Sequence, residues 1–214
     1  MICTELKECM EKTQHVFPKE KKTGKKGKRV AGVKKKEADL YQQPLCPPPC
    51  KSSERQKGCI EFLDCRPKVT CQEKGKSYTL DQGQENPRHE VMLLHIDGGV
   101  ITNPEASTMN KCDYAILVRE GASQTEKKMT AFLIELKGKQ VDHALKQLKA
   151  TLYQAELAPL WESSARVFGR IVCSASVPRI QRTDAYLAME EEFRKRGGSL
   201  KMQEVVFEEE YRNV

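Results

Sequence analysis

The chain has 214 residues, of which 38% are hydrophobic and 31% are charged, and its formal net charge is +7. This length suits one domain of ordinary size with a disordered appendage, and the composition is too polar for the whole chain to form a packed core. The best apolar run, residues 91–96, is far shorter than the roughly 20 residues that cross a bilayer, and residues 1–12 carry charges where a secretory signal needs apolar side chains. These features exclude the membrane and secreted classes, so we expect a cytoplasmic protein without a membrane partner.

Residues 1–45 are polar and basic, and we predict that they form a disordered N-terminal segment. Within them, residues 18–36 hold ten basic residues and one acid, while the rest of the chain carries a net charge of −2. This block has two interpretations: an arm that binds nucleic-acid phosphates without sequence preference, or a solvated tail that keeps the chain soluble. The residues assigned to the nucleic-acid arm are Lys21, Lys22, Lys25, Lys26, Lys28 and Arg29.

Residues 46–90 form a lead-in that is rich in cysteine and proline and contains only short apolar pieces. Five cysteines fall in this window with the spacing C-x3-C-x8-C-x5-C-x5-C: Cys46, Cys50, Cys59, Cys65 and Cys71. A structural Zn²⁺ site is one interpretation, although the paired C-x2-C knuckles of a typical zinc site are missing and the prolines of CPPPC stiffen that loop. Reduced thiols without a metal are the alternative.

From Val91 onward the pattern becomes that of an α/β domain, which we place at residues 91–214. Apolar runs predict strands, and apolar residues that recur with a period of 3.6 predict helices. The predicted strands are residues 91–97, 112–118, 130–137, 166–177 and 200–209, and the predicted helices are residues 141–152 and 183–196. The order β-β-β-α-β-α-β implies a mixed sheet with helices on its faces.

The hairpin of the second and third predicted strands brings acidic residues together. If Val118 and Ala131 flank the connecting loop as opposed positions, antiparallel pairing places Asp113 opposite the end of the third strand. Glu135 and Lys137 are two residues apart, so their side chains leave the same face of that strand. Two carboxylates and an ammonium group therefore gather at one end of the sheet, where burial requires that they pair or bind a cation.

Such a cluster suits metal-assisted hydrolysis of a phosphodiester. Carboxylate oxygens bind Mg²⁺ or Mn²⁺, and the ion polarises phosphoryl oxygens and lowers the pKa of a bound water molecule. An adjacent lysine orients the attacking water or offsets negative charge in the transition state. Asp97, at the end of the first strand, is a reserve ligand or, alternatively, the first residue of the turn at Gly98 and Gly99.

Asp113, the apolar strand that ends in Glu135-Leu136-Lys137, and the helix that carries Gln147 resemble the PD-(D/E)xK superfamily. This superfamily includes restriction endonucleases, Holliday-junction resolvases and RecB-type nucleases. The resemblance covers about residues 85–177 and implies a restriction-endonuclease-like αβββαβ core, with the last helix and strand as additions. It further implies that the metal ligands are Asp113, Glu135 and the backbone carbonyl of Leu136, that Lys137 is the catalytic lysine and that Gln147 is an auxiliary active-site residue.

The chain departs from the family pattern at two places. Cys112 stands where the family pattern has a proline, and the upstream acidic ligand is either Glu85 or Glu90, neither of which lies on a clear helix. The motif E-x-K alone is a weak signal because it recurs elsewhere in the chain. The alternative interpretation of residues 135–137 is an ordinary exposed ion pair at a strand end, and that of Gln147 is a solvated helix residue.

We therefore expect an intracellular nuclease that requires Mg²⁺ or Mn²⁺, with DNA preferred over RNA by family frequency alone and a role in defence or DNA processing. One alternative is a catalytically inactive nucleic-acid-binding or assembly module of the same fold. Another is an RNA endonuclease that is gated by a ligand or partner. A homodimer or a protein partner is compatible with each of these.

Overall fold

The computed structural model describes part of the chain, and every contact reported below belongs to that part. The described residues are 60–83, 89–100, 110–120, 129–137, 140–155, 157–162, 164–174, 181 and 183–214. The predicted segment 1–45 with its nucleic-acid arm, together with Cys46, Cys50, Cys59 and Glu85, lies outside the described residues.

The described strands form a six-stranded and a three-stranded sheet, and both are mixed. Their bounds are β1 (Ile60–Asp64), β2 (Lys68–Glu73), β3 (Lys76–Asp81), β4 (Glu90–His95), β5 (Tyr114–Arg119), β6 (Met129–Leu136), β7 (Arg166–Cys173), β8 (Leu200–Glu204) and β9 (Val206–Glu210). The larger sheet has the order β1-β4-β5-β6-β7-β8, antiparallel from β1 to β6 and parallel from β6 to β8. In the smaller sheet, β3 pairs antiparallel with β2 and parallel with β9.

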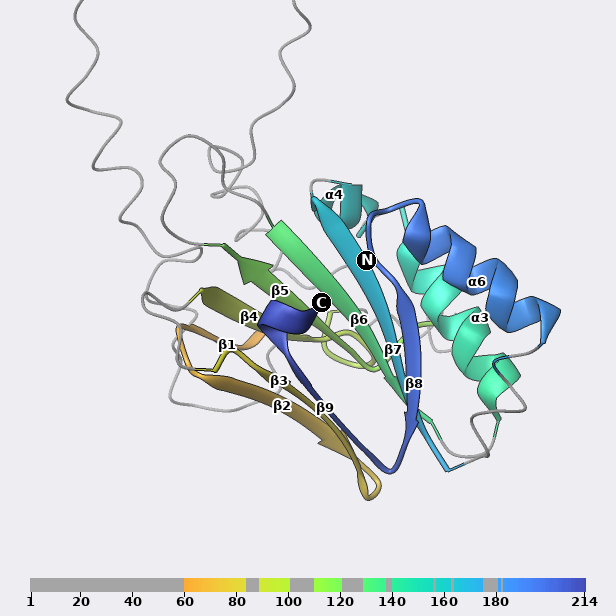
Figure 1. Cartoon of the computed structure of the whole chain (residues 1–214), viewed down its shortest axis with the longest axis horizontal. Helices are drawn as coiled ribbons and strands as arrows, with labels where there is room; N and C mark the ends of the chain where they lie inside the picture. Colours follow the sequence, from red (N-terminus) through yellow and green to blue (C-terminus); the bar gives the residue numbers. More distant parts are fainter. Residues whose placement is uncertain are drawn as a thin grey trace, which may run out of the picture.

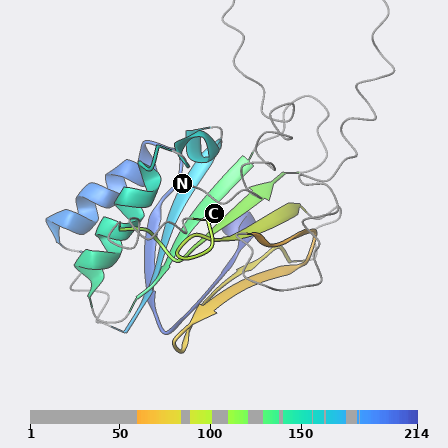
Figure 2. The ribbon, with the colours of Figure 1, turned by 180° about the vertical axis from the view of Figure 1, so that it is seen from behind.

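Helices cover one face of the six-stranded sheet, and the three-stranded sheet packs on its other face (Figures 1 and 2). The described helices are α3 (Val141–Leu152), α4 (Ala158–Glu162) and α6 (Asp184–Arg194), followed at the end of the chain by a 3₁₀ turn, η3 (Tyr211–Asn213). One apolar cluster lies between this sheet and the helices, and a second lies between the two sheets. The predicted mixed α/β class is therefore confirmed. No described helix is both long and apolar enough to span a bilayer.

The sequence periods explain the central elements. The helix α3 has the predicted bounds, and its apolar stripe, which includes Val141, Leu145 and Leu148, is buried. The strand β6 is buried along its whole length, as expected for a strand that is covered on both faces. Thr183 caps α6 by accepting a hydrogen bond from the Tyr186 N–H. From β4 onward the elements follow the predicted order, with α4 as an addition.

The sheets begin at Ile60, whereas the sequence analysis starts the domain at Val91. Residues 60–81 contain three short strands, one of which, β1, pairs with β4. In β2, buried residues alternate with exposed ones, so its apolar content is only half that of a central strand. Because of this low apolar content, the sequence pattern does not predict that residues 60–81 form strands of the domain.

The predicted strand 200–209 is two strands that belong to different sheets. Its first half, β8, pairs with β7 in the larger sheet, and its second half, β9, pairs with β3 in the smaller one. Val205 joins them with a φ of 60°, in the left-handed region that a valine rarely adopts. Valine is not a typical turn residue, so the apolar pattern of residues 200–209 does not predict that the strand is divided at Val205.

A buried arginine joins the two sheets. Arg170, on β7, has no solvent exposure, and its guanidinium forms a two-pronged ion pair with Glu209 on β9. The same guanidinium donates to the carbonyls of Gly169 and Ser199 at 2.8 and 2.9 Å, and Tyr78 on β3 donates to Glu209 at 2.8 Å. A buried charge is tolerated only when it is paired and hydrogen-bonded, so this network fixes β3 and β9 against β7.

We expect Glu209→Ala to lower the free energy of unfolding by about 3 kcal/mol, because it leaves the Arg170 guanidinium buried without its partner. Chemical denaturation should show a lower midpoint with an unchanged slope. Glu208→Ala, at the neighbouring exposed position, is the matched control and should change stability by less than about 0.5 kcal/mol. Equal stability of the two variants would contradict the assigned role of Glu209.

Candidate functional site: a buried acid pair beside a lysine

Asp113 and Glu135 lie opposite each other at one end of the six-stranded sheet. The register of β5 and β6 pairs Ala115 with Leu133, so continuing the same register toward the sheet end brings Asp113 to Glu135. Ala115 and Leu133 both belong to the apolar cluster between the sheet and the helices, and successive side chains alternate between the faces of a strand. The Glu135 carboxylate therefore leaves the face of the sheet that α3 covers, and the Asp113 carboxylate, just before the start of β5, lies within electrostatic range of it.

The Glu135 carboxylate is buried and forms no hydrogen bond of ordinary geometry, although the Lys137 ammonium and the Asp113 backbone N–H are close enough to oppose the rise in its pKa. Glu135 has no solvent exposure, and neither of its carboxylate oxygens has a hydrogen-bond partner among the described residues. The Lys137 ammonium lies 3.5 Å from Oε1, within ion-pair range. Burial, and after it the Asp113 carboxylate, raise the pKa of Glu135 to about 9, against the opposing charge of Lys137. A carboxyl group in this setting costs stability unless a proton or a cation accompanies it.

The Asp113 carboxylate is tied to the end of β6. Its Oδ2 accepts a hydrogen bond from the Leu136 N–H at 2.7 Å, and Asp113 is only 9% exposed. Burial raises the pKa of Asp113 to about 6, the Leu136 N–H opposes that shift, and the Glu73 carboxylate adds to it. The hydrogen bond therefore holds Asp113 in place and leaves its other oxygen, Oδ1, for a further partner.

The Lys137 ammonium is oriented by α3. It donates to Oε1 of Gln147 at 2.7 Å, and Nε2 of Gln147 donates to the carbonyl of Lys111 at 2.8 Å. Gln147 is 6% exposed, so both ends of its amide bind protein groups rather than water. The Lys137 side chain is 25% exposed, which places its ammonium between the buried glutamate and the solvent.

Asp97 and Lys111 border the acid pair. The carbonyl of Asp113 accepts the N–H of Ile96 at 2.8 Å, which brings the end of β4 beside the start of β5. The Lys111 ammonium lies 3.1 Å from Oδ1 of Asp97, and the side chains are 8% and 50% exposed respectively. Asp97, the reserve ligand of the sequence analysis, thus forms an ion pair at the solvent side of the site.

Sequence reasoning missed a fourth acid. Glu73 is the last residue of β2, and its charge contributes to the raised pKa of Asp113, so the two carboxylates lie within electrostatic range. Its partner is Lys74, at 2.6 Å. The alternation of residues 68–73 and the Lys-Gly pair that follows could have revealed a hairpin. Nothing in the sequence, however, shows that a hairpin of the smaller sheet ends beside the acid pair of the larger one.

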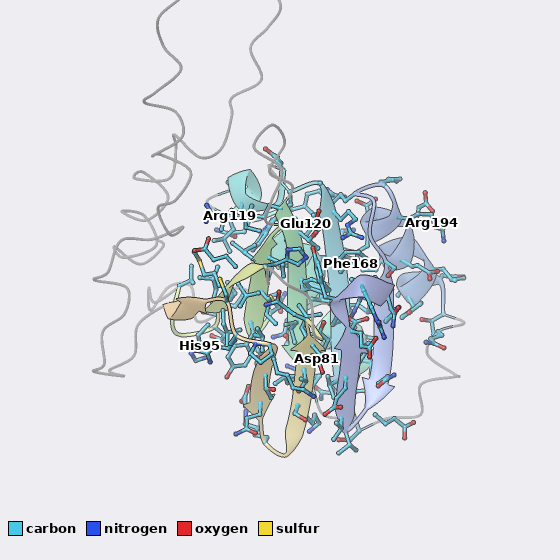
Figure 3. The ribbon with its side chains drawn as sticks, turned by 60° about the vertical axis from the view of Figure 1, so that its left-hand side comes forward. Asp81, His95, Arg119, Glu120, Phe168 and Arg194 are labelled. Carbon is cyan, nitrogen blue, oxygen red and sulfur yellow. The ribbon has the colours of Figure 1, made fainter. Side chains whose placement is uncertain are left out.

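Glu90, one of the two candidates for the upstream acidic ligand, is not brought to this site. It forms an ion pair with Arg119, its partner in the register of β4 and β5. Arg119 ends β5, whereas Asp113 precedes the start of that strand. Figure 3 shows Arg119 and Glu120 at one end of the domain and His95, which pairs with Tyr114 beside Asp113, toward the other.

Two of the five cysteines proposed as zinc ligands lie in the described residues. Cys71 is buried in the cluster between the sheets, where its thiol donates to the carbonyl of Tyr78 at 3.8 Å, and Cys65 is exposed. Within the described ranges, no group of three or more His, Cys, Asp or Glu side chains is arranged to hold a metal ion. Of the predicted metal ligands, only the two carboxylates of Asp113 and Glu135 are placed together, and a cation there would complete its coordination with water and backbone oxygens, as Mg²⁺ does.

Comparison with known proteins found no family model, no curated protein and no solved structure that matches the chain.

The raised pKa of Glu135 predicts a pH-dependent stability. Between pH 4.5, the ordinary pKa of the group, and about pH 9, the folded protein binds more protons at Glu135 than the unfolded chain does, so the free energy of unfolding falls as the pH rises. Glu135→Gln removes this charge, and we expect it to stabilise the metal-free protein by about 2 kcal/mol near pH 8 and by much less near pH 4. Thermal denaturation in a chelator measures both values.

Glu208→Gln is the control for this experiment, because Glu208 is exposed and its variant should leave the pH profile unchanged. If Glu135→Gln destabilises the protein equally at both pH values, the carboxylate has a structural partner and the interpretation is wrong.

Proposed function

We propose that the chain is a divalent-metal-dependent nuclease of the PD-(D/E)xK type, which hydrolyses phosphodiester bonds of nucleic acid. The observation that supports this most strongly is the Glu135 carboxylate, which is fully buried beside Asp113, has the Lys137 ammonium 3.5 Å away and forms no hydrogen bond of ordinary geometry in the described part of the chain. Buried acids with a structural role normally accept such hydrogen bonds. A strongly raised pKa beside a second carboxylate is the pattern expected of a functional site.

A divalent cation suits the donor atoms of this pair. Mg²⁺ and Mn²⁺ prefer carboxylate, carbonyl and water oxygens, and Mg²⁺ retains several of its waters. In the proposal, Asp113 provides Oδ1, Glu135 provides a carboxylate oxygen, and the carbonyl of Leu136 is the third protein ligand. Held by these residues, such an ion would supply Lewis-acid chemistry, namely polarisation of a phosphoryl oxygen and a lower pKa for a bound water molecule.

The remaining site residues orient charge around the scissile phosphate. Lys137 places an ammonium 3.5 Å from Glu135, where it offsets the negative charge that develops on the phosphoryl oxygens. Gln147 holds that ammonium through the 2.7 Å hydrogen bond and is itself held by Lys111. Because Lys137 is kept in one orientation before substrate arrives, its reorganisation during the reaction is small.

The topology is compatible with the proposed family. Three antiparallel strands, β4 to β6, are followed by α3 and then by β7, which lies parallel to β6. This order supports a βββαβ core of the restriction-endonuclease-like kind, with the acid pair at the ends of β5 and β6. In this proposal the smaller sheet, α6, β8 and β9 are additions to the core, and no described helix precedes β4.

DNA remains the preferred substrate because DNA-cutting members are frequent in the family, and defence or DNA processing is the proposed setting. The lysine-rich residues of segment 18–36 would add affinity without sequence preference, since each cation that contacts a phosphate releases counterions. RNA as substrate is the alternative that the experiment below separates.

We expect the full chain to cleave nucleic acid in Mg²⁺ or Mn²⁺ and not in a chelator. Glu135→Gln and Lys137→Ala should each lower kcat by about 100-fold or more, because the first removes a charged metal ligand and the second removes the ammonium that offsets charge in the transition state. The assay compares single-stranded and double-stranded DNA and RNA. The matched controls are Glu208→Gln and Lys146→Ala, which change exposed residues of the same types on β9 and α3.

The possible results lead to different conclusions. If the chain cleaves only RNA, the substrate is RNA rather than DNA, and the proposed hydrolytic mechanism is unchanged. Binding without cleavage by the wild-type chain in every metal would favour the catalytically inactive module. If the Glu135→Gln variant cleaves nucleic acid at the wild-type rate, the acid pair takes no part in the mechanism.

A further inference from the structure

The tip of the β2–β3 hairpin carries an exposed lysine. Glu73 pairs with Lys76, so the loop between the strands consists of Lys74 and Gly75, with φ values of 47° and 75°. Both residues are in the left-handed region, as a two-residue type I′ turn requires. The Lys74 side chain is 84% exposed and its ammonium lies 2.6 Å from Oε1 of Glu73. The turn therefore presents a cation to the solvent.

Backbone hydrogen bonds fix this tip at the site's end of the domain. The N–H of Lys137 donates to Val172 at 2.7 Å, the N–H of Val205 donates to Cys173 at 3.0 Å, and the N–H of Ser77 donates to Val205 at 3.1 Å. These three hydrogen bonds connect the end of β6, through the end of β7, to the start of β3. Figures 1 and 2 show the hairpin tip projecting where β8 passes into β9.

Several carboxylates lie near Lys74 at this end of the domain. The Glu73 carboxylate, and beyond it those of Asp113 and Asp97, raise the pKa of Lys74, so the lysine lies in the field of the site. Lys137 and Lys111 already pair with Glu135 and Asp97 and are largely buried. These carboxylates repel a polyanionic substrate, and an exposed cation beside them reduces that repulsion.

We propose that Lys74 is a substrate-binding residue, whose ammonium contacts a backbone phosphate of the nucleic acid beside the acid pair. The inference rests on the nuclease function proposed above. When substrate binds, the Lys74 ammonium exchanges its solvent-exposed pairing with Glu73 for a phosphate oxygen. The smaller sheet thereby acts as a phosphate-holding extension of the site, and Lys74 takes no part in the hydrolytic step.

The test uses the full chain with Lys74→Asn, Lys74→Arg and Lys68→Gln. Asparagine is favoured in a type I′ turn, so Lys74→Asn removes the charge while the hairpin keeps its conformation. Lys68 is the matched control, because it is an exposed lysine paired with Asp81 at 2.9 Å at the far end of the same hairpin. Steady-state cleavage gives KM and kcat, and binding of a labelled duplex at several salt concentrations, without divalent metal, gives the salt slope.

We expect Lys74→Asn to raise KM by about fivefold with kcat nearly unchanged, and to reduce the slope of log K against log salt by about one. Lys74→Arg and Lys68→Gln should resemble the wild type. A wild-type KM and salt slope in Lys74→Asn, with cleavage intact, would overturn the role of Lys74 and leave the nuclease function standing. A fall in kcat alone would also overturn it. A wild-type chain that neither binds nor cleaves would overturn both.

Discussion

The arrangement of the site depends on the burial of one carboxylate. Glu135 lies one residue before the end of a strand that is covered on both faces, so water cannot solvate its charge, and its carboxylate forms no hydrogen bond of ordinary geometry with the described residues. The Leu136 N–H holds the Asp113 carboxylate beside it, and the negative charge of Asp113 adds to the raised pKa of Glu135. Lys137 compensates this only in part, because its ammonium also binds Gln147. A carboxyl group in this setting is accompanied by a proton or by a cation.

The second sheet is held to that site by a different buried charge. Arg170 lies on the opposite face of the larger sheet and takes both oxygens of Glu209, while Tyr78 binds the same carboxylate from β3. Here the charges are fully paired, in contrast to Glu135. One face of the sheet therefore carries a network with a structural role, and the other carries an unsatisfied acid at its end. Within one domain, a buried charge with full hydrogen bonding therefore contrasts with a buried carboxylate that has an ammonium nearby but no hydrogen bond of ordinary geometry.

The parts of the fold and of the site that could be predicted are those that depend on local sequence patterns. The helix 141–152 and the strands from β4 to β7 have strong local patterns, and the hairpin of β5 and β6 is enough to bring Asp113 near Glu135. The expected register is wrong by one residue, because Val118 pairs with Thr130 and not with Ala131. The strands β2 and β3 have weak apolar patterns, and the turn at Val205 depends on the pairing of β8 and β9 with different sheets. Glu73 and Lys74 reach the site only through these non-local pairings, so the sequence does not reveal them.

The lysines around the acid pair differ in their exposure to solvent. Lys111 is almost fully buried and pairs with Asp97, Lys137 is partly exposed and pairs with Glu135, and Lys74 is largely exposed on the hairpin tip. Electrostatic interactions strengthen as water is excluded, so in the proposed nuclease Lys137 would act on the charge that develops at the reacting phosphate, and the exposed Lys74 would act on the approach of the nucleic acid. Under that proposal Lys137 contributes mainly to the rate of the chemical step and Lys74 to the affinity for substrate. The two contributions are separable because the residues lie on different sheets and share no hydrogen bond in the described structure.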